Sequence, residues 1–217
     1  MSVFITFEGI EGCGKTTQVR LLANSLRRCG LDVLTTREPG GCPIADDVRR
    51  ILLNPDNSAL VPRAELLLYA AARAQHVAEV IQPALARGSW VLCDRFADAT
   101  LAYQGYGRGL GTDLIEMLNE VAAGPTHPQL TILFDLPVEE GLSRARERNS
   151  LTDGPSEGRF EEESLAFHRR VREGYLTLVD RAPERFLVVD ARGERDAVAG
   201  RVRNAVAERL DMHGLLK

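Results

Sequence analysis

The most constraining feature of the sequence is a phosphate-binding loop near the amino terminus, where residues 9–16 read G-I-E-G-C-G-K-T. The loop directly follows an apolar run at residues 3–7 and leads into a helix-compatible stretch from Lys15 onward. A loop of this form functions where a buried strand ends and a helix begins, because its glycines turn backbone N–H groups toward phosphate oxygens. The pattern therefore predicts a strand, a loop and a helix that together bind a nucleoside triphosphate.

We assign the triphosphate contacts of this loop to a continuous set of residues, namely Gly9, Ile10, Glu11, Gly12, Cys13, Gly14, Lys15, Thr16 and Thr17. Lys15 supplies a point charge for the β- and γ-phosphates, and the Thr16 hydroxyl is suited to ligate Mg²⁺. The alternative is a chance glycine-rich turn, which the flanking strand and helix patterns disfavour. Glu11 puts a carboxylate beside an anion site, so we expect its side chain to face something other than the triphosphate.

Four further apolar runs are predicted to be strands, at residues 32–36, 90–93, 130–134 and 186–189. Each run is continuous, which is typical of strands covered on both faces. Helical patterns separate the runs, so the layout predicts an α/β fold with a parallel sheet and helices on its faces. Polar residues follow the strands, and ligands of such sheets bind at the carboxyl edge. We expect the active site at that edge.

The composition limits the classes of partner. A formal net charge of -4 argues against a general nucleic-acid surface, and no run approaches the roughly 20 apolar residues of a membrane span. The four cysteines show no C-x-x-C spacing, which predicts a reduced, cytoplasmic protein. The four histidines have no spacing typical of a metal site, so we expect them to be structural or on the surface.

A long helical pattern precedes the third predicted strand, with residues 64–76 as its middle. Pro83 is expected near a bend of this helix, and Gly88 is expected to end it. Its apolar surface is broader than a single stripe. We therefore expect the long helices to contact a second subunit as well as the sheet.

Four motifs occur in an order that resembles the bacterial thymidylate kinase family, at residues 7–17, 36–41, 94–96 and 102–105. Members transfer the γ-phosphoryl group of ATP to dTMP, forming dTDP for dTTP synthesis. The resemblance runs to about Phe167. It implies a three-layer phosphate-loop kinase fold with a five-stranded parallel sheet, a homodimer and a requirement for Mg²⁺. It also implies one domain, residues 1–217, with a flexible lid at about 144–160.

The resemblance implies a set of residues that bind dTMP, namely Glu11, Arg37, Tyr69, Arg73, Arg95, Thr100, Tyr103 and Gln104. Two arginines, Arg37 and Arg95, would hold the phosphate, since guanidinium groups form bidentate contacts with phosphate oxygens. Tyr69, where the family more often has Phe, would stack on thymine, and Arg73 one turn later would donate to a thymine carbonyl. Thr100 and Gln104 would reach the base.

The other residues near the acceptor would act on its sugar and on the metal. Tyr103 would lie beneath the deoxyribose and disfavour a ribose 2′-hydroxyl, and Glu11 would help to position sugar and phosphate. Asp94 ends the third predicted strand and, with Thr16, would belong to the Mg²⁺ site.

The resemblance also implies arginines that neutralise the transferred charge. The phosphate loop has Glu11 and Cys13 rather than an arginine, so the chain resembles the branch of the family in which the lid supplies the cation. Arg148 is the first candidate, with Arg144 near ATP. The catalytic set is then Lys15, Arg95, Arg148, Arg144 and Glu11. Gly158 stands where similar lids have an acidic residue.

Other interpretations remain open for these residues and for the whole chain. The cluster of Arg144, Arg146 and Arg148 could be an exposed helix face, and Tyr69 could be a core aromatic residue. Thr100 could bond a local helix carbonyl. The chain could be a kinase for another nucleoside monophosphate, or a nucleotide-dependent binding switch. The GTPase motif N-K-x-D is missing from the sequence, which disfavours the switch.

Overall fold

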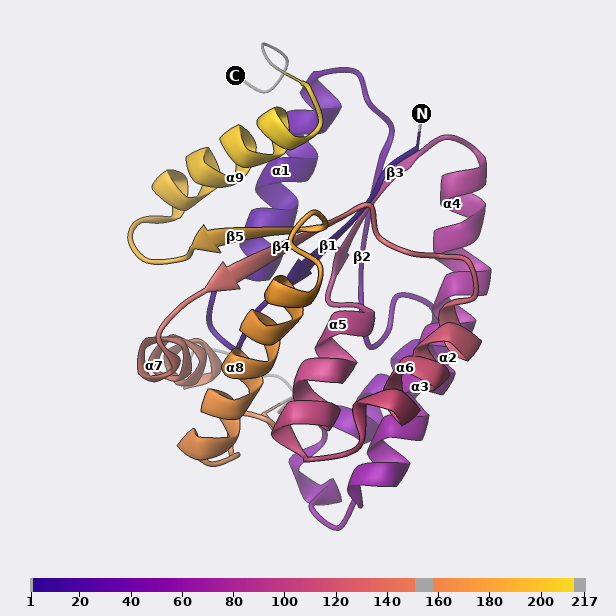
Figure 1. The fold of residues 1–217 in the computed structure, drawn as a ribbon, viewed down its shortest axis with the longest axis vertical. Coiled ribbons are helices and arrows are strands. Elements are labelled where there is room, and N and C mark those ends of the chain that lie inside the picture. Colours follow the sequence, from indigo (N-terminus) through magenta and orange to yellow (C-terminus); the bar gives the residue numbers. More distant parts are fainter. Residues whose placement is uncertain (1, 151–157, 213–217) are drawn as a thin grey trace.

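The computed structural model describes residues 2–150 and 158–212. Its sheet has five parallel strands in the order β2-β3-β1-β4-β5 (Figure 1). The strands are β1 Phe4–Glu8, β2 Val33–Arg37, β3 Trp90–Asp94, β4 Leu130–Asp135 and β5 Phe186–Asp190. Each lies within one residue of its predicted position at both ends. The predicted parallel α/β fold is therefore confirmed.

The central and edge strands differ in burial. Every residue of β1 is buried, whereas β2 and β5 expose part of their length, including half of Val188. The prediction that all five strands are covered on both faces is wrong for these two. These two are the edge strands of the sheet, so each has a neighbouring strand on one side only.

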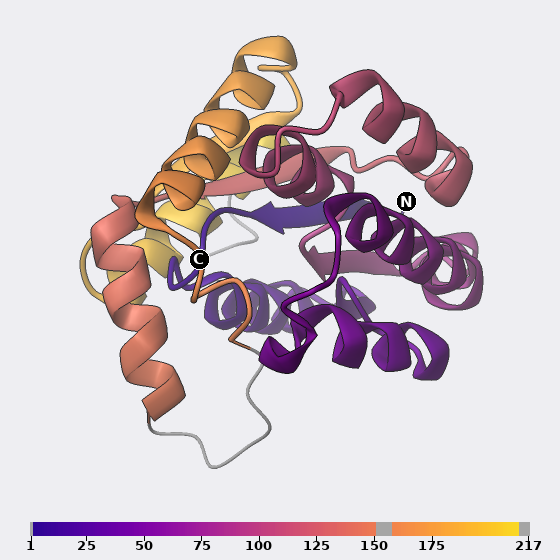
Figure 2. The same cartoon turned by 90° about the horizontal axis from the view of Figure 1, so that it is seen from below.

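The helices surround this sheet in the order α1 Lys15–Arg28, α2 Pro43–Leu53, η1 Pro55–Asn57, α3 Pro62–His76, η2 Val77–Ile81, α4 Gln82–Ala86, α5 Ala97–Thr100, η3 Leu101–Gly107, α6 Thr112–Ala123, α7 Val138–Ser150, α8 Leu165–Arg181 and α9 Arg195–Arg209. Seen from the carboxyl edge of the sheet, α7 lies on one side and α2 and α3 on the other (Figure 2). The elements that carry the predicted site residues therefore meet at one end of the sheet.

Successive side chains of β1 point to opposite faces of the sheet, and helices cover both faces. Phe4 belongs to a cluster with Val77 and Ile81 of η2, whereas Ile5 belongs to the main core with Leu22 of α1. Successive side chains of a strand point to opposite faces, so each face needs its own apolar cover. This produces the three layers that the resemblance implies.

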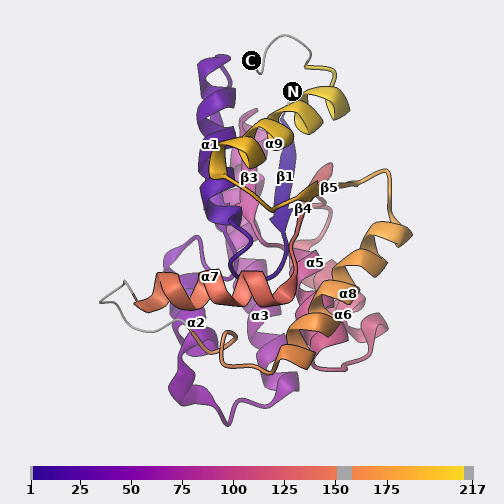
Figure 3. The ribbon, with the colours of Figure 1, turned by 90° about the vertical axis from the view of Figure 1, so that its left-hand side faces the viewer.

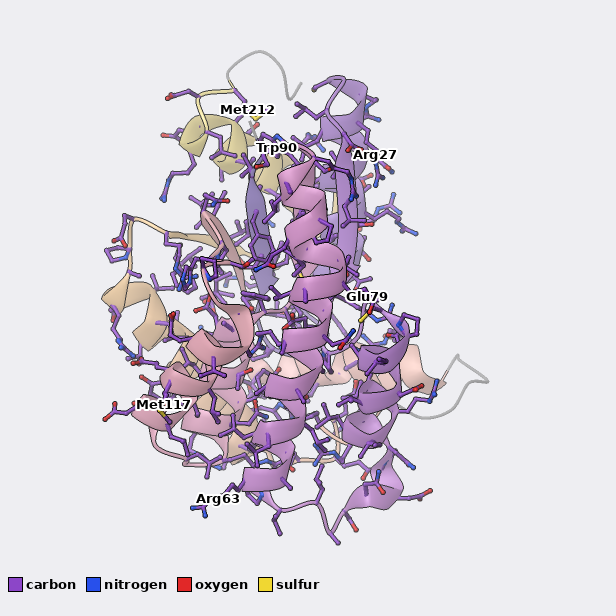
Figure 4. All side chains as sticks on the ribbon, turned by 90° about the vertical axis from the view of Figure 1, so that its right-hand side faces the viewer. Arg27, Arg63, Glu79, Trp90, Met117 and Met212 are labelled. Atoms are coloured by element: carbon purple, nitrogen blue, oxygen red, sulfur yellow. The ribbon has the colours of Figure 1, made fainter. Side chains whose placement is uncertain are left out.

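The long helical pattern forms a nearly continuous run from α3 through η2 to α4, which crosses the front of Figure 4 above Arg63. Pro83 lacks an N–H and crowds the carbonyl of the preceding turn. The wider π-helical turn η2 lies immediately before it and accommodates that loss. Gly88 follows the run with a φ of 91° and turns the chain into β3.

Candidate active site

A cavity of about 850 Å³ opens at the carboxyl edge of the sheet. Most of the predicted site residues line it, namely Glu11, Gly12, Gly14, Lys15, Thr16, Thr17, Arg37, Tyr69, Arg73, Asp94, Arg95, Thr100, Tyr103, Gln104, Arg144 and Arg148. Gly9, Ile10 and Cys13 do not line it, and the side chains of Ile10 and Cys13 are packed into the core. The fold thus brings together residues from seven elements and the phosphate loop.

Lys15 is held by its own loop. Its Nζ donates to the backbone oxygens of Gly9 at 3.0 Å and Ile10 at 2.8 Å, and lies 3.4 Å from Cys13 Sγ. The ammonium group therefore lies inside the loop, and Lys15 lines the cavity.

A close approach of two glycines joins the loop to α7. A Cβ atom on Gly12, whose φ is 70°, would lie 1.9 Å from the backbone oxygen of Gly141. A Cβ on Gly141 would lie 2.5 Å from the oxygen of Glu11. Only glycine fits at both positions, and this contact holds α7 across the carboxyl edge of the sheet (Figure 3).

Thr16 and Asp94 form the predicted metal pair. Thr16 Oγ1 donates to Asp94 Oδ2 at 2.6 Å, which links the start of α1 to the end of β3. Mg²⁺ prefers oxygen ligands and is usually bound by one or two protein groups together with waters and substrate phosphates. A hydroxyl and a carboxylate at this distance fit that requirement.

The Glu11 side chain turns away from the phosphate loop and bonds Tyr103 and Arg95. The Tyr103 hydroxyl donates to Glu11 Oε1 at 2.6 Å, and Arg95 Nη2 donates to the same oxygen at 3.1 Å. Arg95 also donates to the Tyr103 hydroxyl at 2.9 Å, with its guanidinium 4.7 Å from the centre of the Tyr103 ring. The Glu11 carboxylate thus bonds side chains that lie outside the phosphate loop.

The surroundings of Glu11 keep it ionised. Burial alone opposes the charge, but His168 and the charges of Arg95 and Lys15 lower its pKa to about 2. His168 Nδ1 lies 3.2 Å from Glu11 Oε2, and neither ring nitrogen has an assigned hydrogen-bond partner among the described residues. Glu11 is therefore a buried carboxylate with His168, Arg95 and Lys15 as its neighbours.

A second glutamate, Glu8, holds the backbone next to Arg95. Glu8 is buried at the end of β1, where it accepts from the backbone N–H of Phe96 at 2.8 Å and from the Tyr175 hydroxyl at 2.7 Å. Burial and the nearby Asp98 raise its pKa to about 8. Arg95 itself has a φ of 70°, a conformation that non-glycine residues seldom adopt. The Glu8 to Phe96 bond holds the backbone immediately after that residue.

Arg73 is a buried hub on α3, with 1% of its side chain exposed. Nε donates to Glu38 at 2.8 Å and Nη1 to Asn119 at 2.6 Å. Nη2 donates to the backbone oxygen of Phe96 at 3.0 Å and to Thr100 Oγ1 at 2.9 Å. This network orients the guanidinium on the cavity wall before any ligand binds.

Tyr69 and Gln104 lie on the same wall. Tyr69 is one turn before Arg73 on α3, and Gln104 belongs to the π-helical η3. Gln104 Nε2 donates to the buried Glu65 at 2.8 Å. Thr100 of α5 and Gln104 of η3 therefore line the same cavity.

The two predicted lid arginines of α7 line the other side of the cavity. Arg144 pairs with Glu140 in the same helix, and Arg148 Nη2 donates to Glu161 at 2.9 Å. Residues 151–157 of the predicted lid lie outside the described residues. Arg159 is buried, does not line the cavity, and donates to Glu65 at 2.6 Å. The distal end of the predicted lid is therefore fastened to α3.

The remaining strand-exit residues have simpler surroundings. Arg37 lines the cavity and donates to Asp46 at 3.0 Å, with 53% of its side chain exposed. Asp135 pairs with Arg172 and Asp190 with Arg192, outside the cavity. These two carboxylates end their strands without entering the site.

Comparison with known proteins identifies the family. The sequence model described as thymidylate kinase matches residues 7–202. The chain is 61% identical to "Thymidylate kinase" of Syntrophotalea carbinolica, covering 99% of each chain, and 60% identical to that of Geobacter sulfurreducens, covering 97% of this chain and 99% of the relative. The chain belongs to the thymidylate kinase family. It is thus an ATP-dependent nucleoside monophosphate kinase that phosphorylates dTMP to dTDP.

The fold of this family member agrees with a solved relative. A crystal structure of thymidylate kinase from Ehrlichia chaffeensis superposes with a TM-score of 0.76 at 33% identity, covering 94% of this chain and 98% of that one. Among the described residues, none of the helices has the length and apolar character to span a bilayer. All four cysteines are free thiols.

Three groups of this thymidylate kinase site were missed by sequence reasoning. Glu8 lies within the motif at residues 7–17 but was given no role, Glu65 belongs to no motif, and His168 was expected to be structural or on the surface. His168 is buried, but it packs against Glu11 of the phosphate loop. A buried polar residue within an apolar helix pattern is the one signal that could have marked Glu65.

Proposed function

We propose that the cavity holds dTMP and the phosphates of ATP end to end, with the phosphate loop at one end and the wall of Tyr69, Arg73 and Gln104 at the other. The observation that carries this proposal is that one continuous cavity contains both sets of residues. Two reacting groups held in one enclosed space gain most of what phosphoryl transfer needs, which is alignment. The catalytic and binding roles below rest on this arrangement.

On the acceptor side, Arg95 and Arg37 would bind the dTMP phosphate. Arg95 is fixed by Glu11, Tyr103 and Tyr175, whereas Arg37 is exposed and paired with Asp46. Arg95 therefore sets the phosphate position, and Arg37 closes on it. Tyr103 and Glu11 would contact the sugar, Tyr69 would stack on thymine, and Arg73 and Thr100 would donate to its carbonyls.

On the donor side, the loop would bind the ATP phosphates. The Lys15 ammonium would move from the Gly9 and Ile10 carbonyls to the β- and γ-phosphate oxygens, which are stronger acceptors because they are charged. Thr16 and Asp94 would hold Mg²⁺. A bound Mg²⁺ supplies charge neutralisation at the phosphate oxygens.

Arg148 and Arg144 would supply the cation that the phosphate loop lacks. Both line the cavity from α7, which contacts the loop directly through Gly12 and Gly141. Charge placed in this way is worth most in the transition state, where negative charge spreads over the transferred group. We propose Arg148 for that contact and Arg144 for ATP, with the lid at about 144–160 in a single domain of residues 1–217.

We further propose a homodimer in the cytoplasm. Exposed apolar side chains gather on three neighbouring helices, α2, α3 and α6, namely Ile44, Ile51, Leu67, Leu114, Met117 and Val121. Figure 4 shows Met117 at the outer edge of α6. A surface of this kind supports an interface. The free cysteines fit a reducing compartment.

A coupled assay of ADP release tests the acceptor proposal. The acceptors compared are dTMP, dUMP, dCMP, AMP and GMP, each with ATP and Mg²⁺. We expect dTMP to have the highest kcat/KM. Comparable turnover of a purine monophosphate would overturn the placement of thymine against Tyr69 and Arg73, and omission of Mg²⁺ should abolish turnover.

A further inference from the structure

Glu65 determines which way the Gln104 amide faces. The buried Glu65 accepts from Gln104 Nε2 at 2.8 Å, from Arg108 Nε and Nη2 at 3.2 Å each, and from Arg159 Nη2 at 2.6 Å. A carboxylate that receives two guanidinium groups can only accept. Gln104 must therefore present its NH₂ group to Glu65, because its carbonyl oxygen would meet another acceptor there.

The opposite end of the amide is then an acceptor directed at the cavity. Gln104 lines the cavity, and its Oε1 takes no hydrogen bond from the part of the chain that the structure describes. The neighbouring groups can donate. Arg73 has a second Nη1–H besides the one that it donates to Asn119. Thr100 Oγ1 accepts from Arg73, so its own hydroxyl proton remains available to donate. The wall thus presents a carbonyl acceptor among donors.

This pattern matches the imide of thymine, in which an N3–H lies between two carbonyl groups. Cytosine has an unprotonated N3 and an amine in place of one carbonyl. We propose that Glu65 is a positioning residue for base selection, which orients Gln104 Oε1 to accept N3–H and thereby favours dTMP over dCMP. Uracil has the same imide, so Glu65 does not separate dTMP from dUMP. The inference rests on the proposed placement of the base against Gln104.

The variant Glu65→Gln tests this role. Arg159 requires an acceptor, so the new amide would keep its oxygen toward Arg159 and turn its NH₂ group toward Gln104. Gln104 would then flip and present NH₂ to the base. We expect the kcat/KM ratio of dTMP to dCMP to fall by roughly tenfold to a hundredfold, because a donor then faces N3–H. The ratio of dTMP to dUMP should not change.

A matched control keeps the Glu65 carboxylate and removes another of its partners. Arg108→Gln loses two donors to Glu65 and the pair with Glu163, so it disturbs the same network. The amide orientation should survive, and the ratio of dTMP to dCMP should stay at the wild-type value. A ratio that Glu65→Gln leaves unchanged, or that Arg108→Gln lowers equally, would overturn the proposal.

Should Glu65→Gln not fold, proton exchange of bound dTMP tests the Gln104 contact while the Glu65 carboxylate is kept. With ¹⁵N-labelled dTMP, the N3–H proton should exchange with water at least roughly tenfold faster in Gln104→Met than in the wild type, since its acceptor is lost. Equal exchange would overturn the proposal. If the wild type does not turn over dTMP at all, the proposed function fails instead.

Discussion

Arg73, on the wall that it forms with Tyr69 and Gln104, and the two arginines of α7 line the same cavity but are held differently. Arg73 is 1% exposed with four hydrogen bonds to the protein, whereas Arg148 is 60% exposed and Arg144 is 37% exposed. Breaking a buried ion pair is costly because a desolvated charge is left behind, and breaking an exposed pair costs little. Arg73 is therefore held firmly by the protein, whereas the α7 arginines can change partners at little cost.

The difference matches the roles proposed for the two regions. In that proposal the wall distinguishes one base and sugar from others, which favours fixed donors and acceptors with their partners already in place. The proposed role of the α7 arginines is to follow the charge that develops during transfer. Rigidity at the wall and easily exchanged partners on α7 are what these proposed roles require.

The largest expected effect comes from the exposed region. Arg148→Ala should lower kcat by on the order of 10³ if Arg148 acts as an arginine finger, with little change in KM for dTMP or in thermal stability. Steady-state kinetics and thermal unfolding measure these quantities. Arg146→Ala is the control, because Arg146 is exposed on the same helix but does not line the cavity. Equal kcat values for the two variants would reject the role of Arg148.

The next largest effect is expected on the stability of the protein when the buried Arg73 is replaced. Arg73→Met should lower the free energy of unfolding by about 3–5 kcal/mol, because it leaves Glu38 buried without its guanidinium partner. Urea unfolding measures this. The double variant Arg73→Met with Glu38→Gln should recover part of the loss, since the uncompensated charge is gone. A double variant no more stable than the single one would show that packing, rather than charge, holds the wall.

A third test concerns the glutamate behind Arg95. The pKa of Glu8 is raised to about 8 from 4.5, so the native state binds the proton more tightly than the unfolded state. Its stabilising contribution is complete below pH 4.5 and is lost as the pH rises through 8. Between pH 4.5 and 8, Glu8 should lower the free energy of unfolding of the wild type by at most about 1.4 kcal/mol per pH unit. The variant Glu8→Gln should lack this decrease. The measurement is the free energy of unfolding against pH, and parallel curves for wild type and variant would contradict the raised pKa of Glu8.

The smallest effect is expected at the surface pair of α7. Glu140→Gln should change the free energy of unfolding by less than about 1 kcal/mol, because Glu140 and Arg144 are both more than a third exposed. The affinity for ATP should rise slightly as Arg144 loses its competing carboxylate. Chemical denaturation and a KM measurement for ATP decide this. A loss of stability as large as that of Arg73→Met would erase the distinction between the two regions.

Much of the fold could be predicted from local patterns. Each strand is a short apolar run with a polar residue at its exit, and the phosphate loop joins the first run to a helix. These signals lie within a few residues, so they depend on backbone geometry and burial rather than on distant partners. The less complete burial of β2 and β5 was missed because position within the sheet decides which strand is an edge.

The site was predicted in part. Residues with a motif, such as Thr16, Asp94 and Arg95, line one cavity at the carboxyl edge of the sheet. The side chains that hold them were not predicted, because their contacts join distant segments: Glu8 and Tyr175 are 167 residues apart, and Glu65 and Arg159 are 94 apart. Glu11 is intermediate, since its charge within an anion loop predicted that it would turn away, but not toward which groups.

The sequence by itself determined the strand and loop pattern, the phosphate-binding chemistry and the identities of the charged groups, because these depend on residues adjacent in the chain. Only the tertiary structure decided which arginines are buried and held and which stay exposed on α7. It also decided that Glu65 turns the Gln104 amide. Burial sets the cost of an unpaired charge, and burial depends on the packing of segments that are far apart in sequence.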